Sequence, residues 1–104
     1  LCNLWNAAFI ELGGKHPNVS TGMGAIIIAL DVLKPEVLTI AGFDTLLNPS
    51  IPYQSTVETP FNKHGVYPDH DWATENKLLG YLATAYQAEI RDLAGLHIIQ
   101  PHRV

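Results

Sequence analysis

The chain has 104 residues, of which 47% are hydrophobic and 15% charged, and this balance excludes a disordered protein and indicates a globular one. A chain of this length allows one domain at most. The formal net charge of −4 and the scattered basic residues argue against nucleic acid as a partner, because neutralising phosphates requires clustered Lys and Arg. The single cysteine, Cys2, rules out an internal disulfide and a cysteine-based zinc site in this chain.

The first half of the chain predicts two helices. Apolar residues recur at helical spacing over residues 1–12, and Gly13-Gly14 ends this helix. Ser20 or Thr21 is a good N-cap for a second helix that runs to about Leu33. The interior of this helix, GAIIIAL, is apolar nearly all round, which fits a helix packed against a sheet. A buried strand is the alternative, because consecutive isoleucines favour β-structure, but the cap and the length favour a helix.

The rest of the chain predicts two strands and a third helix. After Lys34-Pro35, residues 36–43, EVLTIAGF, show little alternation and predict a short parallel strand. Residues 44–69 are rich in proline and predict a long loop, which in a compact domain is usually functional. Asp71 can cap a third helix with an apolar stripe that continues to Leu93, and Gly95 stops it. Residues 96–99, LHII, predict a closing strand.

The order helix, helix, strand, loop, helix, strand is typical of α/β proteins. We expect a Rossmann-like, mostly parallel sheet flanked by helices. Two short strands do not complete such a sheet, so the remaining strands are expected upstream of Leu1. The chain also begins without an initiator methionine, and we therefore expect residues 1–104 to be the C-terminal portion of a single longer domain. Any membrane anchor is expected outside this chain, because its longest apolar run, Ala25–Leu30, is too short to span a bilayer.

Two stretches predict ligand contacts in the first half of the chain. Ser20, Thr21 and Gly22 would present hydroxyls, free backbone N–H groups and the positive end of a helix dipole, which together bind phosphate. Gly22 would let the ligand approach the backbone closely, although an ordinary N-cap with small residues is the alternative. Gly42-Phe43 ends the predicted strand, where α/β sheets bind ligands, although a plain strand-ending turn is the alternative.

Residues 64–75, HGVYPDHDWATE, place two histidines and several carboxylates around the start of the third helix. His70, just before that helix, can act as a general base near neutral pH. A metal site would use His64, His70 and either Glu75 or Asp69, but their spacing differs from that of helical zinc motifs. A capped and solvated helix start is the third interpretation.

Together these stretches resemble the sialyltransferase family, which transfers sialic acid from CMP-sialic acid. The small sialyl motif of that family runs from a Ser-Thr-Gly turn through an apolar helix to a strand that ends in Gly-Phe, here Ser20-Thr21-Gly22 and Gly42-Phe43. Its very small motif, His-x4-Glu, corresponds to His70 and Glu75. The resemblance covers residues 19–99, including the final helix and strand.

The resemblance implies a variant of the GT-A fold and an inverting, metal-independent glycosyltransferase that needs no cofactor. His70 would take a proton from an acceptor-sugar hydroxyl, and Glu75 would support the turn at His70. The residues implied in binding the CMP-sialic acid donor are Ser20, Thr21, Gly22, Gly42 and Phe43, with Tyr53 or His64 as a further phosphate partner. The large sialyl motif, which supplies much of the CMP site in this family, is expected upstream of Leu1.

The implied partners are the nucleotide-sugar donor and a glycan acceptor. The longer protein would be a Golgi membrane enzyme in a eukaryote or a cytoplasmic enzyme in a bacterium. Animal members carry a disulfide cysteine at the helix-to-strand junction, where this chain reads Leu33-Lys34-Pro35. Two other functions stay open. One is a non-catalytic nucleotide- or anion-binding relative with the same fold, and the other is a metal-dependent hydrolase that uses His64, His70 and Glu75.

Overall fold

The computed structural model describes residues 2–15, 18–47 and 71–102. Its first helix, α1 (Cys2–Glu11), confirms the prediction and ends at the glycine pair. The Gly14 N–H donates to the Phe9 carbonyl at 2.9 Å, and Gly13 has a φ of 99°, a left-handed value that suits glycine. Phe9 is 1% exposed and anchors α1 in the core.

The second helix, α2 (Thr21–Leu33), confirms a helix over the isoleucine run, and the alternative of a buried strand is wrong. Ser20 is its N-cap, and Lys34 ends it in a left-handed conformation with its N–H bonded to the Leu30 carbonyl at 3.1 Å. The buried side chains of this helix are Met23, Ile26, Ile27 and Leu30. Because Ile28 and Val32 are exposed, only one side of α2 is packed against other described residues.

The strand β1 (Val37–Ile40) follows within its predicted range. The expectation that a loop begins at residue 44 is wrong, because residues 44–47 form a short helix, α3 (Asp44–Leu47). The Leu47 N–H donates to the Phe43 carbonyl at 3.0 Å, and Leu46 and Leu47 are buried in the core. These two leucines give α3 an apolar side, whereas the prolines that predicted a loop begin only at Pro49.

The helix α4 (Trp72–Tyr86) begins after Asp71, as predicted, but the expectation that it continues to residue 93 is wrong. Gln87 ends α4 in a left-handed conformation, and residues 89–92 form a strand, β2 (Glu89–Asp92). Apolar residues at positions 86, 90 and 93 fit a helical stripe, but Ala88 and Ile90 also fit the alternation of a strand. Both are fully buried, so packing against the core selects the strand.

A third strand, β3 (Ile98–Ile99), lies within the predicted closing strand and completes a sheet with the order β1-β2-β3. β1 and β2 are parallel, with Val37 opposite Glu89. β2 and β3 are antiparallel, with Ile90 opposite Ile99. The described sheet therefore has three strands rather than two and is mixed, because the chain turns back after β2 at Gly95, which has a φ of 69°.

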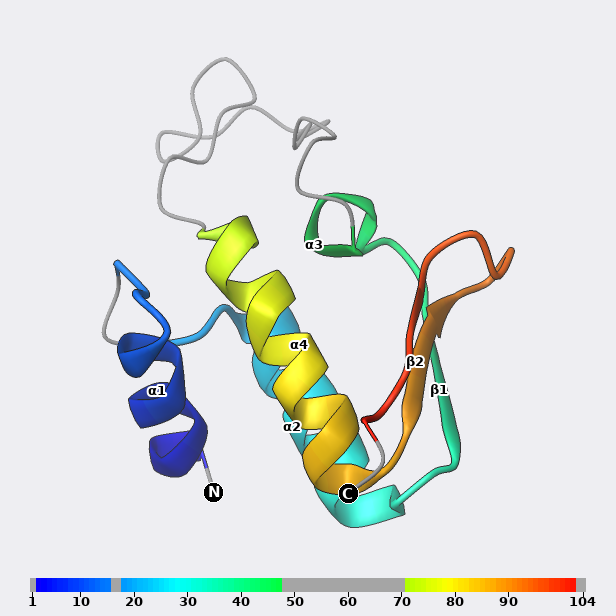
Figure 1. Ribbon diagram of the computed structural model, residues 1–104, viewed down its shortest axis with the longest axis horizontal. Helices are drawn as coiled ribbons and strands as arrows, with labels where there is room; N and C mark the ends of the chain where they lie inside the picture. Colours follow the sequence, from blue (N-terminus) through cyan, green and yellow to red (C-terminus); the bar gives the residue numbers. More distant parts are fainter. Residues whose placement is uncertain (1, 16–17, 48–70, 103–104) are drawn as a thin grey trace.

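Helices α2 and α4 pack on the same face of the sheet, and no described element covers the other face (Figure 1). Ile40 from β1 and Ile90 from β2 join the buried residues of both helices in one hydrophobic core. Because β1 and β2 are parallel, their carboxyl ends lie at the same edge of the sheet, and α3 lies beyond the end of β1 at that edge (Figure 1). None of the described helices is long and apolar enough to cross a membrane.

Candidate functional site

The first turn of α2 is fixed by Ser20. The Ser20 backbone is extended, with φ −64° and ψ 161°, and its Oγ accepts a hydrogen bond from the Met23 N–H at 3.3 Å. Its carbonyl accepts the first bond of the helix from the Gly24 N–H at 2.9 Å. The amides of Thr21 and Gly22 have no acceptor inside the helix because of their position in its first turn. They therefore point out of the positive end of α2.

Glu75, in the first turn of α4, joins the two predicted motifs. Its Oε1 accepts a hydrogen bond from the Ser20 Oγ at 2.8 Å, and its Oε2 accepts one from the Ser20 N–H at 2.6 Å. The side chain is only 2% exposed. The carboxylate thus lies at the N-terminal end of α2 and within the first turn of α4, and both helix dipoles favour negative charge there. Glu75 therefore directly supports the turn at Ser20.

Gly22 and Phe43 bring the end of β1 against α2. A Cβ built on Gly22 would lie 2.7 Å from Cε1 of Phe43, which is closer than van der Waals contact allows. The Phe43 ring therefore packs on the first turn of α2 at the place where any other residue would carry its side chain. The space that Gly22 opens beside α2 is filled by this ring in the structure.

Gly42 forms the turn between β1 and α3. Its φ is 79°, and a Cβ built on it would meet nothing within 4 Å, so the backbone conformation rather than crowding favours glycine. This turn directs Phe43 back toward α2. The predicted residues Ser20 to Gly22 and Gly42-Phe43 consequently meet at the carboxyl end of β1, the edge at which open α/β sheets bind ligands.

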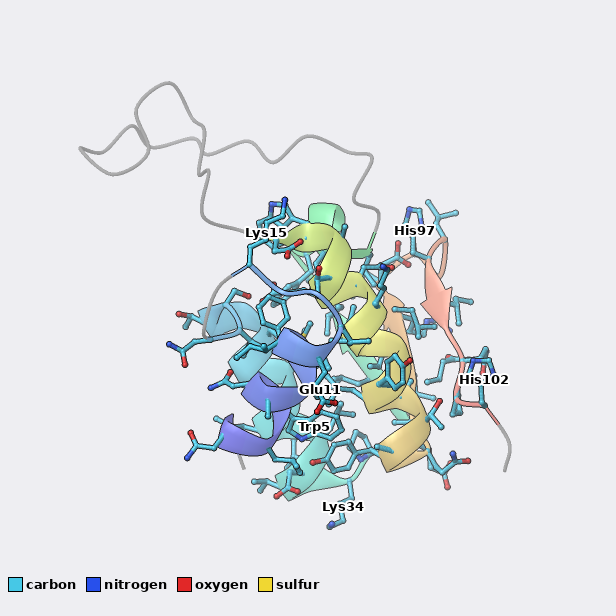
Figure 2. All side chains as sticks on the ribbon, turned by 60° about the vertical axis from the view of Figure 1, so that its left-hand side comes forward. Trp5, Glu11, Lys15, Lys34, His97 and His102 are labelled. Carbon is cyan, nitrogen blue, oxygen red and sulfur yellow. The ribbon has the colours of Figure 1, made fainter. Side chains whose placement is uncertain are left out.

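Asp71 connects the start of α4 with the segment that precedes α2. Its Oδ1 accepts from the Thr74 N–H at 3.3 Å, as an N-cap does, and its Oδ2 accepts from the Lys15 N–H at 3.2 Å. Burial raises the pKa of Asp71, but hydrogen bonds from Thr74 and Lys15 and the charge of Lys15 outweigh burial and lower this pKa below 3.8. Figure 2 shows Lys15 at the end of the molecule where α4 begins and Lys34 at the opposite end. Lys15 is thus a cation close to the candidate site that no sequence motif indicated.

The lowered pKa of Asp71 predicts a loss of stability in acid. A carboxyl group with a folded pKa below its unfolded pKa stabilises the fold above about pH 4, and this contribution disappears as the pH falls through the folded pKa. Asp71→Asn keeps a good N-cap but removes the titration. Urea unfolding at pH 6 and pH 3 should therefore show a smaller loss of stability on acidification in Asp71→Asn than in the parent. Equal losses in the two proteins would contradict this role of Asp71.

Asn76 attaches α3 to α4. Its Nδ2 donates to the carbonyl of Leu46 at 2.8 Å and to that of Leu47 at 3.3 Å, which satisfies carbonyl groups at the end of α3. The sequence did not indicate this contact, because an asparagine on a helix surface usually faces water. Asn76 helps to fix the segment that follows Phe43 and so the position of Phe43 beside α2.

Three predicted site residues, Tyr53, His64 and His70, lie outside the described residues, and so does Asp69. His70 immediately precedes Asp71 in the sequence. Within residues 2–15, 18–47 and 71–102, no group of three or more His, Cys, Asp or Glu side chains could hold a metal ion. Both carboxylate oxygens of Glu75 accept hydrogen bonds from Ser20, which favours a structural role for Glu75 over metal ligation.

A groove of about 910 Å³ lies between α1 and the second half of α4. Trp5 from α1 and Leu12, which directly follows α1, line it together with Lys77, Tyr81 and His102. Figure 2 shows Trp5 between the two helices, with His102 beyond α4. The site residues predicted from the sequence do not line this groove in the described part of the chain. It is therefore separate from the junction of Ser20 and Glu75.

The contacts of Ser20 with Glu75 and of Gly22 with Phe43 bring three separate stretches of the chain to one end of α2. The resemblance to sialyltransferases rests on the short motifs in these stretches. Comparisons with protein-family models, with curated proteins and with solved structures found no match for this chain.

Proposed function

We propose that this chain is part of a sialyltransferase-like enzyme that transfers sialic acid from CMP-sialic acid to a hydroxyl of an acceptor sugar. The observation that carries the proposal is the pair of hydrogen bonds between Glu75 and Ser20. It joins the Ser-Thr-Gly turn to the His-x4-Glu stretch, although the two residues are 55 positions apart in the sequence. The family resemblance requires these two stretches to serve one reaction, and the contact is consistent with that requirement.

The contacts of Ser20 indicate which groups in the first turn of α2 would be free to bind phosphate. Ser20 is occupied by Glu75 and by the cap of α2, so its N–H is not available to a donor phosphate. The amides of Thr21 and Gly22 lie at the positive end of the helix dipole, and the Thr21 side chain is exposed. These groups would bind the phosphate of CMP and stabilise the charge that builds on it as it leaves.

His70 would act as the general base of the reaction. It precedes Asp71, whose two carboxylate oxygens accept backbone hydrogen bonds from Thr74 and Lys15. Asp71 is therefore engaged in fixing the start of α4, whereas an imidazole has a pKa near neutrality and suits proton transfer. The acceptor hydroxyl would lose its proton to His70 and attack the anomeric carbon, and CMP would leave in a single displacement with inversion.

Phosphate binding by α2 predicts a difference between CMP and cytidine. Thr21→Val removes the exposed hydroxyl, and Gly22→Ala forces the Phe43 ring away from the first turn of α2. Thr21→Val should weaken CMP binding about tenfold, since a hydrogen bond to a charged group contributes roughly 1.5–3 kcal/mol. Gly22→Ala keeps its N–H but should weaken CMP binding by a similar factor, because the displaced ring shifts the first turn of α2. Binding of cytidine, which lacks the phosphate, should change little. Calorimetry of both ligands with the full-length protein measures these changes.

Gly24→Ala is the matched control for Gly22→Ala. Both glycines lie in α2, but a Cβ built on Gly24 meets nothing within 4 Å. This substitution should leave CMP binding unchanged and slightly stabilise the helix, because alanine has the higher helix propensity. Equal losses for CMP and cytidine in Thr21→Val and Gly22→Ala would contradict a phosphate-binding role for this turn.

A further inference from the structure

The groove between α1 and the second half of α4 is lined by a single face of α4. The residues that line it from α4 are Lys77, Gly80, Tyr81, Thr84 and Ala85. These positions follow one another at spacings of three and four residues, so they share one face of the helix. The opposite face carries the buried leucines that pack into the core. The groove volume of about 910 Å³ lies at the upper end of the range for small-molecule sites, roughly 300–1,000 Å³.

Trp5 contributes an aromatic ring whose position is fixed before any ligand binds. Its Nε1–H donates to the Tyr86 hydroxyl at 3.4 Å, and that hydroxyl donates to Oδ1 of Asp31 at 3.1 Å. The rings of Trp5 and Tyr86 are also in contact, with 6.0 Å between their centroids. Because the indole has no second donor, Trp5 offers the groove an apolar ring rather than a hydrogen bond. Tyr81, which is 58% exposed, brings a second ring from α4.

Gly80 leaves the middle of this helix face without a side chain. A glycine inside a helix is less favourable than alanine, and crowding or a positive φ is the usual structural reason for it. Neither reason applies to Gly80. A Cβ built on it would meet no described atom within 4 Å, and its φ is not positive. The described fold therefore does not require glycine at this position, whereas a ligand that packs against the backbone of α4 would require it.

The charges that line the groove indicate a neutral ligand. Glu11 lies on α1 close to Trp5 (Figure 2), and Lys77 lies on α4. Neither side chain has an ion-pair or hydrogen-bond partner among the residues that the structure describes. A charged ligand would meet a like charge at one of them, and a purely apolar ligand would remove both from water without a partner. A neutral ligand with hydroxyl groups suits both, because a hydroxyl donates to a carboxylate and accepts from an ammonium group.

We propose that this groove binds a neutral oligosaccharide. A sugar ring has hydroxyls at its edge and C–H groups on its faces, and these C–H groups pack on the negatively polarised face of an aromatic ring. Trp5 and Tyr81 contact the faces of the sugar rings. Glu11 and Lys77 bond to their hydroxyls, and Gly80 lets a ring approach the helix backbone. The groove is separate from the first turn of α2, so the proposal does not rest on the proposed transfer reaction.

Gly80→Ala in the full-length protein separates ligand binding from folding. The substitution should raise the Tm by about 2 °C or more, because alanine has the higher helix propensity. It should also weaken oligosaccharide binding about tenfold, because the added methyl group occupies space that a sugar ring needs. Gly24→Ala is the matched control, since its Cβ also meets nothing within 4 Å but does not line the groove. This control should raise the Tm similarly and leave the affinity unchanged.

An array of neutral oligosaccharides, followed by calorimetry with the ligand that binds most tightly, measures this affinity. Tyr81→Ala should weaken binding about fivefold or more, whereas Tyr81→Phe keeps the ring and most of the affinity. Failure of the full-length protein to bind any oligosaccharide on the array would overturn the proposal. Equal affinities of Tyr81→Ala and the parent would also overturn it, because the sugar would then bind elsewhere. A lower Tm in Gly80→Ala would overturn it as well, because polypeptide rather than a glycan would then pack on Gly80.

Discussion

Replacing His70 with alanine in the full-length protein should lower the rate of sialic acid transfer about 100-fold or more and leave the affinity for CMP nearly unchanged. A positioned general base contributes roughly 10²–10⁴-fold to such a reaction, and alanine has no group that can accept the proton of the acceptor hydroxyl. The groups that would contact CMP lie in the first turn of α2, so His70→Ala should leave these contacts intact. Steady-state transfer rates and calorimetry of CMP binding measure the two quantities separately.

His97→Ala is the matched control for His70→Ala. His97 lies between β2 and β3, and its carbonyl rather than its imidazole accepts the Asp92 N–H at 3.2 Å. Figure 2 shows His97 near that turn, on the side of the molecule where the sheet lies. This control should leave both the transfer rate and the CMP affinity unchanged. Transfer by His70→Ala at the parent rate would remove His70 from the mechanism.

Replacing Glu75 with alanine should lower the free energy of unfolding by about 3 kcal/mol. The substitution leaves the Ser20 N–H and hydroxyl without their carboxylate partner, and each unsatisfied donor costs roughly 1–3 kcal/mol. Glu75→Gln keeps the size of the side chain and one acceptor oxygen, so its loss should be smaller. Urea unfolding followed by circular dichroism measures these differences.

Glu11→Ala is the control for Glu75→Ala, because Glu11 also lies in a helix but its side chain is exposed. Its free energy of unfolding should stay within about 0.5 kcal/mol of the parent value. Glu75→Ala should also weaken CMP binding, since Ser20 positions the first turn of α2. If Glu75→Ala were as stable as Glu11→Ala, the contact with Ser20 would not hold α2 and α4 together.

Local sequence signals were sufficient for the elements that begin and end with clear caps. Ser20 and Asp71 cap α2 and α4 as predicted, and the glycine pair after α1 ends that helix. These features depend on interactions within five residues of the chain, which a sequence displays directly. The end of α4 was not predictable in this way, because Ala88 and Ile90 fit both a helical stripe and a strand. Their burial in the core, a property of the whole fold, decides between the two.

The contacts that build the candidate site could not be predicted from the sequence in the same detail. The motifs predicted that Ser20 and Glu75 matter, but not that they bond to each other. The contact between Lys15 and Asp71 had no sequence signal, because a backbone N–H is present in every residue except proline. The packing of the Phe43 ring on Gly22 had no sequence signal either. Such contacts join distant segments and depend on how α2, α3 and α4 pack.

The central claim is tested most directly by incubating the full-length protein with CMP-sialic acid and a panel of glycan acceptors in the presence of EDTA. The proposed mechanism predicts release of CMP that depends on the acceptor, a product with inverted anomeric configuration by NMR, and rates that EDTA does not change. Binding of CMP without transfer to any acceptor would contradict the proposed enzyme and favour a nucleotide-binding relative. Activity that EDTA abolishes would contradict the metal-independent mechanism.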